Sequence, residues 1–199
     1  MPPTETGRIA DHPINKLFLD RWSPRAFDGQ PVPRADLLTM LEAARWAPSA
    51  SNLQPWRFLY ALKGGPDWEL FLGFLNEGNR VWCKDAGALI VLLSKTTRTS
   101  KDGGEVPSYT HAHDAGCAWG FLALQAVMMG YDAHGMAGID RERAARDLGV
   151  PAEYRVEQMI AVGRRSDPAS LPEQVRARER PNGRRPLAES AMEGRFRAG

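Results

Sequence analysis

The segment 114–129 restricts most strongly how this chain can fold. Its residues are small or apolar on nearly every side of a helix, and Gly130 follows it. They include Ala115, Gly116, Ala118, Phe121, Leu122, Leu124, Ala126 and Val127. A helix without a polar face is typical of a protein interior, so the pattern predicts a buried helix with the rest of the chain packed around it.

Helix and strand patterns alternate on both sides of this segment. Leu37, Met40, Leu41 and Ala44 share one helical face, and that helix is expected to end near Trp46. The continuous apolar run 88–93 predicts a central strand that is buried on both faces. Further helices are expected at 14–19, 67–76 and 141–148, and Asp140 is expected to cap the last of them. Further strands are expected at 58–62, near 133 and at 156–162. The predicted fold class is α+β, a mixed sheet with helices on both faces.

The 199 residues suit a single domain, since the sequence contains neither an internal repeat nor a linker. Residues 1–13 are rich in proline and polar residues and predict a flexible arm. Residues 167–199 are rich in proline and arginine and predict an extended C-terminal segment. Residues 94–108 are rich in Lys, Thr, Ser and Gly, which predicts a long surface loop or a lid.

Composition excludes several functions. A net charge of +2 is too small to indicate binding to nucleic acid or to a membrane surface. No apolar run reaches the length of a membrane span, and no signal peptide is evident, so a cytoplasmic location is expected. Cys83 and Cys117 are interpreted as packing residues. His111 and His113 lie in a predicted loop and are interpreted as solvated rather than as metal ligands, because no third ligand is near them in sequence.

Three polar clusters are candidates for a binding site. Arg21, Ser23 and Arg25 share a short loop, where two guanidinium groups and a hydroxyl suit a phosphate. A second loop, between Pro48 and Pro55, carries Ser49, Ser51, Asn52 and Gln54, whose polar groups suit the edge of a heteroaromatic ring. Arg184 and Arg185 lie in the C-terminal segment.

Each cluster also has a simpler interpretation. The first is compatible with a solvated basic turn, the second with a helix cap and turn network, and the third with a charged, solubilising end. Asp114 and Glu105 are possible general bases, but no nucleophile is paired with either.

Taken together, the clusters resemble the FMN-dependent nitroreductase family. The family's R-x-S-x-R-x-[F/Y] loop is matched by residues 21–27, and its A-P-S-x-x-N-x-Q-P-W element is matched without a gap by residues 47–56. Residues 114–130, 134–138 and 184–187 resemble later segments more loosely. The resemblance covers residues 14–190 and implies a homodimer with a mainly antiparallel sheet.

The resemblance also implies roles for particular residues. Arg21 and Ser23 would contact the FMN phosphate or ribityl chain, and Arg25 would lie near the pyrimidine end. Ser49, Asn52 and Gln54 would reach the flavin from the other subunit. The full implied cofactor-binding set is Arg21, Trp22, Ser23, Arg25, Pro48, Ser49, Asn52, Gln54, Met136, Ala137, Gly138, Arg184 and Arg185, with Met136 to Gly138 along the isoalloxazine and the last two on the phosphate.

The implied activity is hydride transfer from NAD(P)H through N5 of FMN to a small electron-poor acceptor such as a nitroaromatic or a quinone. The mechanism would be ping-pong, with no catalytic acid or base and no metal. One alternative is a flavin-binding or flavin-storing protein without turnover. Another is a small basic interaction domain, which the low net charge disfavours.

Overall fold

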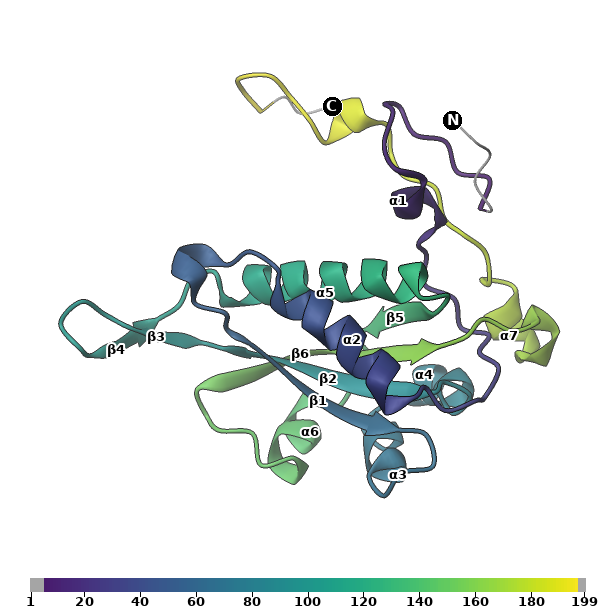
Figure 1. The fold of residues 1–199 in the computed structure, drawn as a ribbon, viewed down its shortest axis with the longest axis horizontal. Helices are drawn as coiled ribbons and strands as arrows, with labels where there is room; N and C mark the ends of the chain where they lie inside the picture. The colour runs from purple at the N-terminus through teal and green to yellow at the C-terminus, as the bar shows by residue number, and fades with distance from the viewer. Residues whose placement is uncertain (1–5, 197–199) are drawn as a thin grey trace.

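A computed structural model describes residues 6–196 of the chain (Figure 1). The helices are α1 Lys16–Asp20, α2 Arg34–Arg45, α3 Trp68–Leu72, α4 Glu77–Cys83, α5 His111–Met128, α6 Arg141–Asp147 and α7 Glu173–Arg176. The strands are β1 Trp56–Leu62, β2 Ala88–Lys95, β3 Thr97–Thr99, β4 Glu105–Pro107, β5 Asp132–Met136 and β6 Tyr154–Gly163. Short 3-10 turns are η1 Ala50–Asn52, η2 Pro168–Ser170 and η3 Leu187–Glu189.

Four strands form the central sheet in the order β1-β2-β6-β5, and every pair in it is antiparallel. Strand β2 is in the interior of this sheet and is buried along almost its whole length. Ile90 and Leu92 pack against α2 and α5, whereas Leu89 and Val91 pack against α3, α4 and α6. Figure 1 shows the resulting three layers, with α2 and α5 on one side of the sheet. The α+β class with helices on both faces is confirmed.

Helix α5 differs from its prediction. Ala115, Ala118 and Leu122 on one face are buried against the sheet and α2, as expected. The opposite face is open: Phe121 is 41% exposed and Met128 is 66% exposed. The prediction of burial on all sides is therefore wrong for the single chain, because an apolar surface that meets another molecule has the same sequence pattern as one that meets the core.

Two other predictions need correction. Residues 94–108 do not form a long loop, because β2 runs on to Lys95 and is followed by the β3–β4 hairpin. The helix expected at 67–76 ends at Leu72, and α4 follows it with Asn76 as N-cap, whose side chain accepts a bond from Asn79 N. Gly73 and the buried Phe74 and Leu75 separate the two helices.

The terminal segments lie together and project from the body of the molecule (Figure 1). Thr6 Oγ1 donates to the carbonyl of Leu19 at 2.8 Å, and Leu187 N donates to Asp11 Oδ2 at 2.8 Å. Residues 1–5 of the predicted arm and residues 197–199 of the C-terminal segment, including Arg197, lie outside the described residues. Among residues 6–196, no helix is long and apolar enough to cross a membrane.

Gly87 joins three segments, and this generates a prediction about stability. Its N–H donates to Val162 O, and its carbonyl accepts from Val32 N and Lys63 N. A Cβ there would lie 2.8 Å from Val32 N. Gly87→Ala should lower the free energy of unfolding by about 2–3 kcal/mol, measured by urea denaturation.

Gly78→Ala is the matched control. A Cβ at that position has its nearest neighbour, Asn76 Oδ1, at 3.8 Å, and the residue is helical. It should leave stability unchanged or raise it by about 0.5 kcal/mol. Equal denaturation midpoints for the two variants would contradict the packing described at Gly87.

Candidate functional site

The loop from Arg21 to Phe27 follows α1 and is attached to the end of the sheet. Phe27 forms a bridge with Arg165, and Ser166 N donates to Ala26 O. His134 on β5 bonds the carbonyl of Pro24 through Nδ1 at 2.9 Å. Because a carbonyl only accepts, this bond requires the proton on Nδ1. Burial lowers the pKa of His134, which favours its neutral form.

Arginine side chains gather on one side of this loop. Arg21 Nη1 donates to Ser23 Oγ at 3.3 Å. Burial, and next the positive charge of Arg184, lower the pKa of Arg21, whereas Asp132 raises it. Arg21 and Ser23 of the first sequence cluster are therefore bonded to each other, and Arg184 of the third cluster is near enough for its charge to act on Arg21. Arg185 lies outside this group, with a side chain that is 85% exposed and 4.0 Å from Glu189.

Trp22 points inward from the same loop. Its ring is buried, and the guanidinium of Arg165 lies 5.2 Å from the ring centroid. Its indole Nε1–H is also buried, and it has no hydrogen-bond acceptor in the part of the chain that the structure describes. A buried donor without an acceptor is costly, and no described residue compensates that cost.

Arg25 is engaged by the C-terminal segment. Glu179 Oε1 accepts from the backbone N–H groups of Arg25 at 2.7 Å and Ala26 at 2.9 Å, and Glu179 Oε2 lies 3.6 Å from Arg25 Nη1. The Glu179 side chain is 1% exposed. A buried carboxylate that accepts two backbone bonds fixes the loop conformation. Nothing in the sequence around Glu179 signals this role, which depends on a contact across more than 150 residues.

At the end of β5, backbone atoms and not side chains are available to contact a ligand. The Met136 side chain is buried, with its sulfur 3.2 Å from Cys83 Sγ, so only its backbone can face a ligand. Ala137 is exposed. A Cβ on Gly138 would lie 2.8 Å from Asn79 Nδ2, which itself donates to Gly138 O at 3.1 Å. Asn79, together with Asn76, is a polar group beside this strand end that sequence reasoning missed.

The loop 48–54 has an unusual backbone. Ser51, Asn52 and Gln54 have φ angles of 50°, 54° and 48°, in the left-handed region that costs a non-glycine residue roughly 1–2 kcal/mol. Ser49 Oγ accepts from Gln54 N at 3.0 Å, so Ser49 takes part in the turn network that was considered as the simpler interpretation. Pro48 is exposed at the end of α2. Strain of this kind tends to accumulate at functional sites.

Asp114 holds this loop in place. Its carboxylate is 3% exposed and lies at the start of α5. Oδ2 accepts from Ala50 N at 3.2 Å and from Thr110 Oγ1 at 3.0 Å, while Oδ1 lies 3.2 Å from His113 Nδ1. The carboxylate is thus bonded to the loop and to its own helix, which explains it better than a role as general base.

The two histidines of α5 have separate partners, and both lie in its first turn instead of the loop that the sequence predicted. His111 Nδ1 bonds Ser94 Oγ at 2.7 Å and lies 3.5 Å from Glu157 Oε1. Ser94 and Glu157 share the same ring nitrogen, so the arrangement differs from a hydrolase triad, in which the two nitrogens serve different partners. Residues 6–196 contain no group of three metal-ligating side chains.

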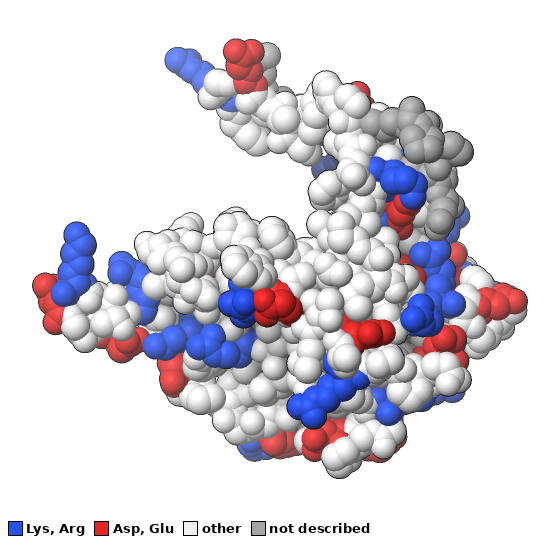
Figure 2. Space-filling view, viewed as in Figure 1, with Lys and Arg blue, Asp and Glu red and all other residues white. Residues whose placement is uncertain are grey.

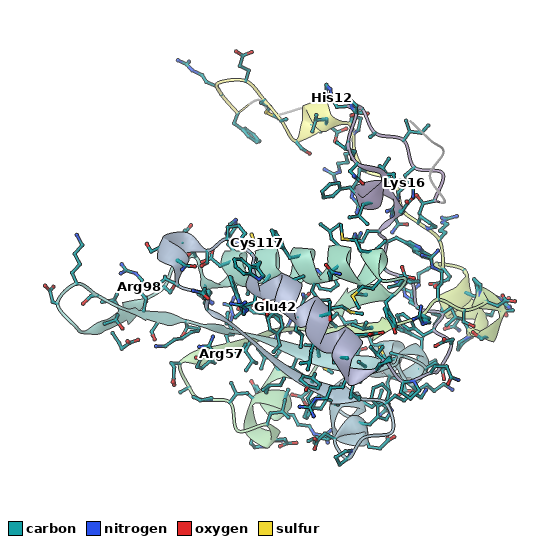
Figure 3. The ribbon with its side chains drawn as sticks, viewed as in Figure 1. His12, Lys16, Glu42, Arg57, Arg98 and Cys117 are labelled. Atoms are coloured by element: carbon teal, nitrogen blue, oxygen red, sulfur yellow. The ribbon has the colours of Figure 1, made fainter. Side chains whose placement is uncertain are left out.

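The two polar loops lie at opposite ends of α5 in one chain. The loop 48–54 is bonded to Asp114 at the beginning of the helix, whereas α1 and Arg165 border a cavity of about 760 Å³ together with Val127 and Met128 at its end. With 18 residues rising 1.5 Å each, α5 is about 27 Å long. In Figure 3, Lys16 of α1 lies well away from Cys117, which is in the first half of α5.

Removing the Asp114 carboxylate should release the strained loop. In Asp114→Asn, amide hydrogen exchange across residues 49–54 should become roughly 10- to 100-fold faster, because a charge-assisted bond to Ala50 is weakened. Exchange in β2 should not change. Hydrogen–deuterium exchange mass spectrometry measures both, and Asp102→Asn in the exposed β3–β4 turn is the control. Unaltered exchange at 49–54 would show that Asp114 does not restrain the loop.

Several known proteins are similar to this chain in sequence and in fold. Residues 19–67 and 62–164 match the profile described as the Nitroreductase family. Protein DrgA of Synechocystis is 30% identical over 64% of this chain and 72% of its own length. An NADH dehydrogenase of Thermus thermophilus is 27% identical over 73% of this chain and 83% of its own.

A solved structure is still more similar. The crystal structure of an oxidoreductase containing FMN superposes with a TM-score of 0.96 at 49% identity, covering 98% of this chain and 99% of the other. It agrees with this chain over nearly the whole length, terminal segments included. By profile, sequence and structure, the chain belongs to the nitroreductase family.

Proposed function

We propose that this protein is an NAD(P)H-dependent FMN oxidoreductase that reduces a small electron-poor acceptor such as a nitroaromatic or a quinone. Membership of the nitroreductase family supports an oxidoreductase. The similar crystal structure contains FMN, and a relative is named an NADH dehydrogenase, which supports the cofactor and the donor. The observation that carries the proposal is the bond between Arg21 and Ser23, with Arg184 near enough for its positive charge to act on Arg21.

This group of residues fits the phosphate of FMN. Arg184 is close enough for its positive charge to disfavour that of Arg21, and Arg21 is half-buried. A dianionic phosphate relieves that repulsion and accepts hydrogen bonds from guanidinium groups and from the Ser23 hydroxyl. The donor set is therefore appropriate for a phosphorylated ligand.

The loop 48–54 serves the flavin of a second subunit in this proposal. One FMN does not span the length of α5, so this loop and the arginine group of the same chain do not meet on one cofactor. If two α5 helices pack antiparallel about a twofold axis, the start of one lies beside the end of the other. The strained loop of one chain then faces the arginine group of its partner.

The open face of α5 supports such a dimer. Gly116 and Gly120 are four residues apart, and a Cβ on either would have no neighbour within 4 Å. Phe121 and Met128 are exposed apolar side chains of the same helix. Figure 2 shows a white, uncharged surface over α5, facing the overhanging terminal segments, and charged side chains over α2. An apolar face of this kind is typical of a subunit interface.

In this activity the protein's own residues bind the cofactor and orient it. When bound there, FMN would supply the redox chemistry that relays hydride from NAD(P)H to the acceptor, and the kinetics would be ping-pong. The arginine group holds the phosphate, the backbone at Ala137 and Gly138 borders one side of the ring, and the loop with Asn52 and Gln54 borders it from the partner. No general acid or base is required of the chain.

A visible spectrum tests this function. The purified protein, after incubation with FMN and gel filtration, should retain the absorption band of oxidised flavin. NADH or NADPH should bleach the band without oxygen, and a nitroaromatic or quinone should restore it. A protein that stays colourless refutes FMN binding. A yellow protein that neither nicotinamide bleaches is a flavin-binding protein without turnover.

Disrupting the α5 face tests the shared site. Phe121→Glu should weaken dimerisation roughly 100-fold or more, because the interface would have to bury a carboxylate, and FMN retention should fall with it. Analytical ultracentrifugation and flavin fluorescence measure the two effects. Ala152→Glu, in an exposed turn between α6 and β6, is the control. A monomer with unchanged FMN affinity would contradict the contribution of the partner's loop.

A further inference from the structure

We infer that a cavity beside Arg57 is a binding site for a small carboxylate with a compact apolar or aromatic body. The cavity has a volume of about 300 Å³ and lies between the start of β1, the end of β2 and the turn that follows α6. This volume is at the lower end of the range for pockets that bind small organic molecules. None of the residues around it takes part in the proposed function.

The walls of the cavity are apolar side chains that the core leaves partly uncovered. They are Leu59 of β1, Leu148 and Val150 after α6, and Tyr154 of β6, all packed against the core cluster that contains Leu93. This cluster is on the face of the sheet opposite α2 and α5, so the α5 pairing proposed above does not cover the cavity. Walls of this kind favour a ligand with an apolar body, because the ligand removes their surface from water.

Arg57 occupies a position in the sheet whose neighbours are apolar. Side chains alternate along a strand, so Arg57, Leu59 and Ala61 point to the same face of the sheet. Ala61 is buried and Leu59 is partly buried in the core cluster on that face. Across the sheet, Arg57 is paired with Leu93 of the same cluster. Packing alone would favour an apolar residue at Arg57, so the charge in this row needs another explanation.

The guanidinium of Arg57 is oriented by its own strand and by an aromatic ring. Its Nη1 donates to the carbonyl of Trp56 at 2.7 Å and to the carbonyl of Gln54 at 3.2 Å. Its central carbon lies 5.7 Å from the centroid of the Tyr154 ring. Within residues 6–196, its Nε and Nη2 have no acceptor, and no carboxylate forms an ion pair with it. These two nitrogens are the edge of a guanidinium that binds a carboxylate through two parallel hydrogen bonds.

The charge and the apolar walls together define the class of ligand. A carboxylate suits the free edge of the Arg57 guanidinium, and an apolar body suits the walls beside it. An inorganic anion would use the arginine but leave the walls in contact with water, and a neutral apolar molecule would leave the arginine unused. The combination therefore favours a small organic acid, for which benzoate is a suitable probe.

Titration of the full-length protein with benzoate tests the site. Benzoate should shift the methyl NMR signals of Leu93 and Val150 in a saturable way, with a Kd at least about tenfold lower than that of benzamide, its neutral analogue. In Arg57→Gln, the Kd for benzoate should rise roughly 10- to 100-fold, to about the value for benzamide, because the charge-assisted bonds are lost. Arg57→Lys, which keeps the charge without the guanidinium fork, should give an intermediate value.

Arg98→Gln is the matched control. In Figure 3, Arg57 lies near the start of β6, whereas Arg98 lies on the β3–β4 hairpin, where it is exposed. This variant should leave the Kd for benzoate unchanged. Val150→Phe fills part of the cavity and keeps Arg57, so it should weaken benzoate binding at least about tenfold. If thermal denaturation shows that Arg57→Gln is unfolded, Arg57→Lys and Val150→Phe decide.

Each contrary result has a distinct meaning. If up to about 10 mM benzoate does not shift the signals of Leu93 and Val150, the cavity is not a site for such acids. Equal affinities for benzoate and benzamide overturn the recognition of charge. An unchanged Kd for benzoate in Arg57→Gln also overturns it, because Arg57 would then only brace the start of β1. A protein that binds benzoate at these methyl groups but binds no FMN supports this inference and refutes the proposed function.

Discussion

The burial of strand β2 on both faces is the constraint on which the rest of the structure depends. Its side chains point alternately into two cores, so both sides of the sheet must be covered by helices. On one side the cover is α2 and α5, and Tyr131, just after α5, donates from its hydroxyl to Asp36 of α2 at 2.6 Å. That bond fixes where α5 ends and therefore where β5 begins.

The position of β5 in turn decides where the arginine loop lies. Asp132, its first residue, bonds Arg165 through both carboxylate oxygens at 3.1 Å, and the Arg165 guanidinium lies over Trp22. Two residues further along, His134 holds the carbonyl of Pro24. The basic loop is thus attached at two points to a strand that the core has already placed. The sheet positions the candidate site, and the loop supplies its chemistry.

Patterns that depend on local periodicity were predictable from the sequence. The helix with Leu37, Met40 and Ala44 on its buried face, the strand at 88–93 and the helix capped by Asp140 all agree with the structure. Each is determined by side-chain spacing or by a short capping interaction. The sequence also singled out Arg21 and Ser23 in one cluster and Arg184 in another, and their role in binding stays a prediction.

Features that depend on distant contacts were not predictable. Glu179 and Asp114 each hold a polar loop by accepting backbone hydrogen bonds, and neither neighbouring sequence indicates it. Arg8 sits in a stretch whose composition is typical of a flexible arm, yet it donates to the carbonyls of Leu19 in α1 and of Arg21 just after that helix. The exposed face of α5 was mistaken for core because hydrophobicity does not reveal which molecule covers it.

Two destabilising features remain in the single chain, and they lie at opposite ends of α5. At one end, arginine side chains of like charge are gathered; at the other, three non-glycine residues adopt left-handed backbone conformations. Neither is explained by the stability of the chain alone, since each raises the free energy of the folded state. In the proposed antiparallel dimer these two ends adjoin across the interface. One phosphorylated flavin would then neutralise the arginines with its phosphate and bond the strained loop with its ring, so cofactor binding, dimerisation and folding would stabilise one another.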